Sequence, residues 1–175
     1  MEPTEPSQST PELHPDLGQL AWLVGTWRGA GVGDYPTIES FQFGQELVIS
    51  HIGKPWLSHV SRSWALDPST GEPTRPLAVE TGFWRMVPDS LDAELLLAHP
   101  TGYVEIWTGH VFEKSIELIT DLVGRTATAK EMTAGKRMYG IVEGVDLGWV
   151  YEMSAMGQAL QPHLSARLKR DGDAG

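Results

Sequence analysis

Cysteine is absent from the sequence of 175 residues, and its absence excludes several kinds of chemistry. Disulfide bonds, thiolate nucleophiles, iron–sulfur clusters and cysteine-ligated zinc or haem all require a thiol. Any metal ion would therefore depend on nitrogen and oxygen ligands, with methionine sulfur as a weak addition.

Positive charge and long apolar runs are also scarce. Thirteen Lys and Arg stand against 23 Asp and Glu, which gives a net charge of −10 and a pI near 4.9. Binding to nucleic acid or to an anionic membrane needs the opposite balance, so we expect neither partner. No run approaches the roughly 20 apolar residues of a membrane-spanning helix, and the first 15 residues lack a secretory signal pattern. We therefore expect a cytoplasmic protein.

The composition, with 41% hydrophobic and 21% charged residues, is that of one globular domain. Residues 1–14 are rich in Pro, Glu, Ser and Thr, which predicts a disordered N-terminal tail. Residues 171–175 are small or acidic and form a predicted C-terminal tail. The domain is thus expected to span residues 15–170.

Short segments of alternating or β-branched residues, separated by many of the 19 Gly and 12 Pro, favour an all-β protein. The predicted strands are 25–33, 37–50, 57–66, 77–87, 94–98, 103–108, 115–119, 126–132, 137–142, 149–155 and 160–168. Their short connections are typical of antiparallel neighbours, and closing the sheet removes its two exposed edges. We expect an up-and-down antiparallel barrel of about ten strands, similar to fatty-acid-binding protein and lipocalin barrels, with an interior cavity.

One short helix is predicted ahead of the strands. Leu17, Leu20, Ala21 and Val24 recur at the spacing of one helical face, and Gly25 ends the pattern. A helix of two turns is not stable alone, so we expect it to cover an open end of the barrel.

A glycine cluster follows this helix, with Gly25, Trp27, Gly29 and Gly31 on one face of the predicted first strand. Glycines allow a barrel strand to bend, so the favoured interpretation is a bent strand with Trp27 closing one barrel end. The alternative is a close approach of a ligand to the backbone. A phosphate-binding loop is disfavoured, because the cluster follows a helix and lacks the Lys-Ser/Thr pair.

The residues alone single out no catalytic site. None of the six histidines has the spacing of a zinc motif, and a lone histidine is usually satisfied by a backbone carbonyl. No Ser lies in a nucleophile-elbow pattern. The seven tryptophans indicate either core packing or an aromatic-lined pocket.

Five blocks, in order along the chain, resemble the nitrobindin family. The first block alone is also similar to the start of fatty-acid-binding proteins, but the resemblance extends from about Leu20 to Arg170. The blocks are Gly25 to Gly31, Tyr35 to Ile38, Ile49 to Pro55, Glu80 to Arg85 and Gln161 to Leu164.

This resemblance implies a ten-stranded barrel that holds one haem b per chain, with His163 as the axial ligand. It also implies haem contacts for Thr37 and Lys136, with Lys130 as a competing candidate for the latter. Some members have a distal histidine, but Leu77 to Val79 occupy that segment here, so none is expected.

The family's activity implies that the ferric protein binds nitric oxide and isomerises peroxynitrite to nitrate, with the small molecule as its partner. Two alternatives remain open at this point. One is a carrier or sensor of haem, nitric oxide or an apolar ligand without turnover. The other is an interaction module with a vestigial pocket. A homodimer is also plausible.

The strand position of His163 raises a geometric question. Alternation places His163 with Ser165 on the face opposite Leu164 and Ala166. If the latter pair faces the interior, His163 must lie at the start of the strand, or a bulge must redirect it. A backbone carbonyl is expected to hold its Nδ1 proton. Predicted apolar lining comes from tryptophans and from Phe41, Phe43, Met153, Met156 and Leu164.

Overall fold

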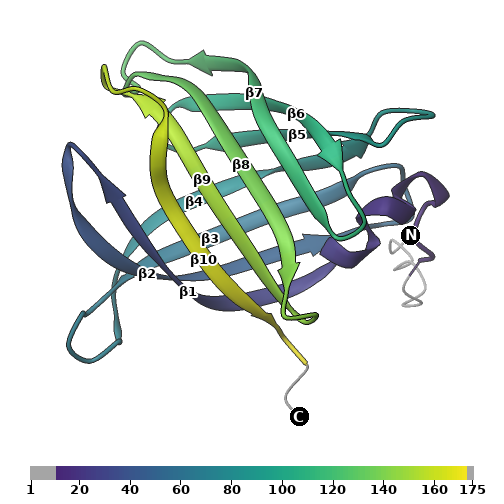
Figure 1. Ribbon diagram of the computed structural model, residues 1–175, viewed down its shortest axis with the longest axis horizontal. Coiled ribbons are helices and arrows are strands. Elements are labelled where there is room, and N and C mark those ends of the chain that lie inside the picture. The colour runs from purple at the N-terminus through teal and green to yellow at the C-terminus, as the bar shows by residue number, and fades with distance from the viewer. Residues whose placement is uncertain (1–10, 173–175) are drawn as a thin grey trace, which may run out of the picture.

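The computed structural model describes residues 11–172, so most of the predicted N-terminal tail and part of the C-terminal tail lie outside it. Ten antiparallel strands close into one barrel with a short helix at one end (Figure 1), which confirms the predicted fold class. Each strand pairs with its neighbours in sequence, and β1 pairs with β10 to close the ring. Within the described residues, no helix is long and apolar enough to cross a membrane. The elements are η1 (Pro15–Leu23), β1 (Gly25–Tyr35), β2 (Ile38–Ser50), β3 (Leu57–Leu66), β4 (Pro73–Met86), β5 (Asp92–His99), β6 (Tyr103–Val111), β7 (Ser115–Arg125), β8 (Met132–Val142), β9 (Asp146–Ala155) and β10 (Gln161–Arg170).

Most strands follow the sequence prediction, but the predicted strand at 126–132 is wrong. Thr126 to Lys130 form the connection between β7 and β8, and Met132 is the first residue of β8. The Thr-Ala-Thr-Ala sequence alternates as a strand does but offers no large side chain to bury. A turn forms instead, in which Ala129 N donates to Thr126 O.

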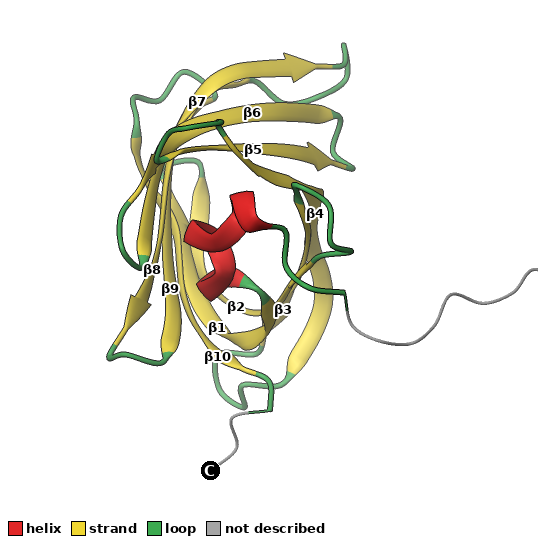
Figure 2. Ribbon diagram, turned by 90° about the vertical axis from the view of Figure 1, so that its right-hand side faces the viewer, coloured by secondary structure: helices red, strands yellow, loops and turns green. Residues whose placement is uncertain are grey.

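The helix is a 3-10 helix, which corrects the predicted buried face. Leu17, Leu20 and Leu23 are fully buried, whereas the predicted Ala21 is exposed. Residues three apart lie above one another when a helix has three residues per turn, so the buried face follows that spacing. The helix fills one open end of the barrel, as expected (Figure 2).

The glycines of β1 let neighbouring chains approach closely. A Cβ at Gly31 would lie 2.3 Å from Ser165 O and 2.4 Å from the Phe43 ring. Gly29 is similarly crowded by the backbone of β10, 2.2 Å from Arg167 O. Trp27 is fully buried beside η1, and its indole Nε1 donates to Leu23 O at 2.8 Å. The structure therefore places Trp27 at the closed end of the barrel, as expected, and uses the glycines for close packing of β1 against its neighbours, while the bending of β1 stays a prediction.

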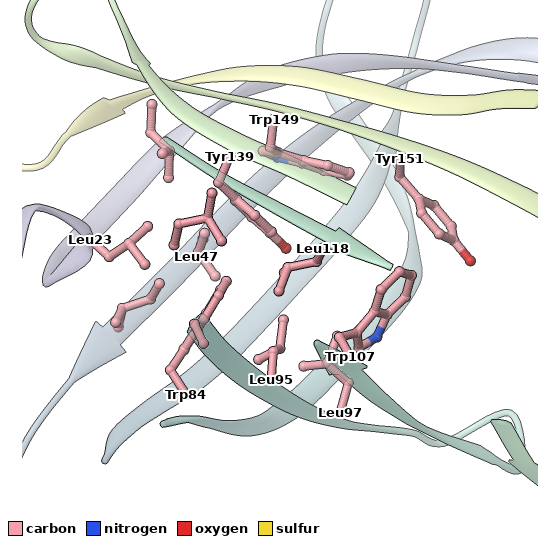
Figure 3. Close-up of a cluster of buried hydrophobic side chains, with 14 of the residues drawn as sticks. Leu23, Leu47, Trp84, Leu95, Leu97, Trp107, Leu118, Tyr139, Trp149 and Tyr151 are labelled. Atoms are coloured by element: carbon pink, nitrogen blue, oxygen red, sulfur yellow. The ribbon is translucent and has the colours of Figure 1, made fainter. Parts of the chain in front are cut away.

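The barrel interior is packed towards η1 (Figure 3). Leu23 lies at one side of the buried cluster, and Trp107 and Tyr151 lie at the other. Apolar side chains, including the three buried leucines of η1, fill the barrel at the helix end. The opposite end, where the β1–β2 and β9–β10 turns meet, is the pocket end.

Candidate functional site

A pocket of about 840 Å³ opens at the pocket end, a volume within the range of about 300–1,000 Å³ usual for small-molecule sites. The predicted lining residues Phe41 and Leu164 are part of its wall, whereas Phe43 is buried. All seven tryptophans lie within residues 11–172, and none of them lines the pocket. They therefore pack in the core or lie in the outer wall. The pocket is lined by Val32, Gly33, Asp34, Ser40, Phe41, Gln42, Leu66, Pro68, Val150, Tyr151, Glu152, Pro162, His163, Leu164 and Ser165.

A bulge at the start of β10 brings His163 into this pocket. The pairing with β9 shifts between Pro162 and Leu164, which leaves His163 without a cross-strand partner there. Leu164 pairs with the buried Tyr151, so Leu164 faces the interior. The bulge therefore redirects His163 to the same side. The sequence predicted either a position at the start of the strand or a bulge, and His163 has both.

Three groups hold the His163 ring. Its Nδ1 lies 3.0 Å from the backbone oxygen of Asp34, which is the carbonyl partner expected for this nitrogen. The rings of Tyr35 and Tyr151 contact it edge-on, with centroid distances of 5.3 and 5.9 Å. When Nδ1 donates to the carbonyl, Nε2 keeps its lone pair and can ligate a metal. Burial lowers the pKa of His163, which favours this neutral form.

The other predicted cofactor contacts lie in different places. Thr37, in the β1–β2 turn, donates from Oγ1 to Sδ of Met156 at 3.9 Å, so it lies at the pocket end. Lys130 lies in the β7–β8 connection at that end, next to Glu131, whose carbonyl accepts from Met156 N.

The structure does not place the Lys136 side chain on the same side of the barrel wall as His163. Lys136 alternates with the buried Gly135 and Arg137 on β8, which places it on the outer face of the barrel. The outward position of Lys136 disfavours the cofactor contact that the family resemblance implied for it. Lys130 becomes the better candidate.

A buried ionic cluster, which the sequence analysis missed, lies inside the barrel next to the pocket. Arg137 makes a bidentate pair with Glu80, with N–O distances of 2.5 and 3.0 Å. Burial alone would raise the pKa of Glu80, but the charge of Arg137 and its hydrogen bonds hold that pKa well below its usual range. The alternation of Arg137 with buried residues on β8 was the signal that could have found it. The cluster comprises His59, Glu80, His99, Glu105 and Arg137.

His59 makes the stability of the apoprotein depend on pH. Desolvation lowers the pKa of the fully buried His59, and its Nδ1 accepts from Trp84 Nε1 at 3.1 Å. Unfolding restores a pKa of about 6.5, so the unfolded chain binds more protons and stability falls as the pH drops below that value. We expect His59→Gln, whose amide oxygen can still accept from Trp84, to lose less stability than wild type between about pH 7.5 and 5.5.

Urea unfolding at the two pH values measures this difference. His110→Gln is the control, because the His110 side chain is 48% exposed. An identical loss in wild type and His59→Gln would contradict the assignment of His59 as a buried neutral group.

The donor set fits haem better than a free metal ion. Among the described residues, no three His, Cys, Asp or Glu side chains converge as metal ligands. Haem iron needs few protein ligands because the porphyrin nitrogens supply the rest, and a single histidine is a common proximal ligand. His163 can supply this ligand, because its Nδ1 is hydrogen-bonded to the Asp34 carbonyl and apolar residues line the pocket beside it.

Comparison with known proteins identifies relatives along almost the whole chain. The family model described as "THAP4-like, heme-binding beta-barrel domain" matches residues 16–170. A protein named peroxynitrite isomerase from Nocardioides sp. is 53% identical over 165 residues, covering 94% of this chain and 99% of the relative. A ferric nitrobindin-like protein from Streptomyces griseus is 45% identical over 161 residues, covering 91% of this chain and 83% of the relative.

Solved structures agree with the fold. The crystal structure of Rv2717c from M. tuberculosis matches with a TM-score of 0.79 and 40% identity, over 91% of this chain and 99% of that one. An S-type phycobiliprotein lyase from Guillardia theta matches with a TM-score of 0.55 and 11% identity, over 86% and 89% of the two chains. The second likeness shows the barrel fold alone.

Proposed function

The chain belongs to the family of THAP4-like heme-binding β-barrel domains, and from this premise we propose that residues 15–170 are one domain that isomerises peroxynitrite to nitrate. The resident cofactor is haem b, one per chain, with His163 as its axial ligand. Relatives at 46–53% identity named peroxynitrite isomerase support the activity.

The observation that carries the proposal is the setting of His163. The bulge turns the residue into the pocket, and the Asp34 carbonyl engages Nδ1. Of the two ring nitrogens, Nε2 is then the one available to iron. Thr37 and Lys130, at the same end of the barrel, would contact the polar edge of the cofactor.

The proposed isomerisation needs little acid–base catalysis from the side chains of the protein. Peroxynitrite and nitrate contain the same atoms and carry the same charge, so the conversion needs no net proton, electron or water. Bound haem supplies a Lewis-acidic ferric centre for this rearrangement. The chain contributes a neutral, oriented imidazole, while Phe41, Leu66 and Leu164 exclude water from part of the pocket wall.

Peroxynitrite decay tests the proposed activity. We expect haem-loaded ferric protein to accelerate the decay in stopped-flow measurements, with nitrate as the main product, beyond an equal concentration of free hemin. Saturable haem binding without acceleration over hemin would instead support the carrier or sensor alternative. The same ferric protein, mixed with nitric oxide, tests the proposed nitric oxide binding by its shift of the haem absorption band.

A homodimer is a further proposal, supported by an apolar row on the outer face of the barrel. Cross-strand pairing places Phe83 beside Leu96, Leu96 beside Ile106, and Ile106 beside Leu122. Phe83 and Leu122 are 49% and 51% exposed, and a second copy would cover them. The mass in solution from light scattering tests this, and a monomer across the micromolar range would reject it.

A further inference from the structure

The buried pair of Arg137 and Glu80 has no part in the proposed chemistry, yet it lies in the middle of the barrel. The Arg137 side chain is 3% exposed and that of Glu80 is 18% exposed. They come from β8 and β4, which are separated in the barrel by β5, β6 and β7. A buried ion pair is rarely a net source of stability compared with well-packed apolar residues. Its presence here therefore suggests a positioning role.

The guanidinium of Arg137 is held by hydrogen bonds at its two terminal nitrogens and by aromatic rings, while its Nε has no hydrogen-bond partner among the described residues. Both of its terminal nitrogens donate to the carboxylate of Glu80, and Nη1 also donates to the Tyr139 hydroxyl at 3.2 Å. Its Cζ lies 4.6 Å from the ring centroid of Tyr151 and 5.0 Å from that of Trp107. Trp107 and Tyr151 are neighbours at the same side of the buried cluster (Figure 3), with their rings 6.0 Å apart. The position of the guanidinium therefore constrains the ring of Tyr151.

Tyr151 connects this pair to His163. On β9, Tyr151 lies opposite Arg137 of β8 and Leu164 of β10 in the strand register. Its ring meets the His163 ring edge-on at 5.9 Å. The bulge frees His163 from a cross-strand partner, so its orientation depends on side-chain contacts and on the Asp34 carbonyl.

The two tyrosines beside His163 are held with unequal strength. The Tyr35 hydroxyl lies within 3.3 Å of the Met153 and Ala155 oxygens and accepts from Ala155 N at 3.1 Å. Among residues 11–172, the Tyr151 hydroxyl has one hydrogen-bond partner, the thioether of Met132 at 3.7 Å, which is a weak acceptor. Its orientation therefore depends on the contact with the guanidinium.

We propose that Arg137, anchored by Glu80, is a positioning residue that holds the Tyr151 ring against His163 and so fixes the orientation of the imidazole. The consequence for haem rests on the proposed function, because it assumes that His163 is the axial ligand. The effect on the imidazole itself does not depend on haem.

The test uses the full chain with both charges removed, since Arg137→Met alone would leave Glu80 buried without its partner. In the Glu80→Gln/Arg137→Met variant we expect the apoprotein to lose the nuclear Overhauser contacts between the Tyr151 and His163 rings. We also expect the Nδ1–H resonance of His163, protected in wild type by the Asp34 carbonyl, to broaden through exchange. These NMR signals report orientation and are unaffected by a uniform loss of stability.

The haem-loaded forms provide the second measurement. Transfer of haem to excess apomyoglobin should be roughly tenfold faster from the double variant than from wild type, the lower end of the effects usual for residues that orient a metal ligand. The matched control is Glu46→Gln/Arg28→Met, which removes an ion pair on the outer face whose side chains are 23% and 54% exposed. The control should leave both measurements unchanged.

Arg137→Lys keeps the proposal testable if the double variant fails to fold. Lysine preserves the charge opposite Glu80 but cannot stack a planar group on Tyr151. Ring contacts that are weakened in this folded variant would support the positioning role. A folded variant of either kind with unchanged His163 signals would overturn it. Unchanged haem transfer together with altered His163 signals would support the positioning role and contradict His163 as the axial ligand.

Discussion

His163→Ala should abolish saturable haem binding or weaken it by roughly 100-fold or more, since it removes the one histidine among the described residues that line the pocket. The substitution removes a half-buried ring whose polar contact is to one backbone oxygen, so the barrel should remain folded. Titration with hemin, followed by the Soret band, measures the change against wild type. Circular dichroism checks the fold.

His99→Ala is a useful comparison, because His99 lies on β5 outside the pocket wall and pairs with Glu105 at 2.8 Å. We expect this variant to be less stable but to bind one haem per folded chain. If His163→Ala binds haem with wild-type affinity and spectrum while folded, another residue ligates the iron and the assignment of His163 is wrong.

Trp27→Ala should lower the free energy of unfolding by about 3–5 kcal/mol, among the largest effects for one side chain in this barrel. The indole is fully buried, donates to Leu23 O, and lies under the guanidinium of Arg170 with Cζ 4.1 Å from the ring centroid. Its removal leaves a cavity beside η1 and frees the Leu23 carbonyl. Urea unfolding of the apoprotein measures the loss, and Phe83→Ala, at a half-exposed outer position, should cost far less.

Trp27→Ala also distinguishes two possible roles of the glycine-tryptophan motif, which are to close the barrel end or to shape the cofactor site. Trp27 lies at the helix end of the barrel, away from the pocket, so haem affinity per folded molecule should stay close to that of wild type. A large loss of haem affinity in folded Trp27→Ala would show that the motif shapes the cofactor site directly. Equal stability of Trp27→Ala and wild type would contradict its role in closing the barrel end.

The barrel was predictable because its strands carry a strong local signal. Alternating segments with marked turns led to an expectation of about ten antiparallel strands, and closure followed from the cost of exposed edges. The helix type was not predictable from a helical face, because Leu17 and Leu20 satisfy both the three-residue and the 3.6-residue period. The burial of Leu23 and the exposure of Ala21 distinguish the two.

The proposed ligand could be named from the sequence, but the way in which the fold holds it could not. A family resemblance named His163, and alternation indicated that a bulge or a strand start had to turn it inward. The choice of the Asp34 carbonyl as the Nδ1 partner depends on the pairing of β1 with β10, which joins residues distant in sequence. The Arg137–Glu80 pair was missed for the same reason, since 57 positions separate the two residues along the chain.

A crystal structure of the haem-loaded ferric protein tests the central claim most directly. The account predicts iron bonded to Nε2 of His163, with Nδ1 still hydrogen-bonded to the Asp34 carbonyl and the cofactor edge near Thr37 and Lys130. Iron bonded to a different side chain, or haem bound outside the pocket that His163 lines, would contradict it.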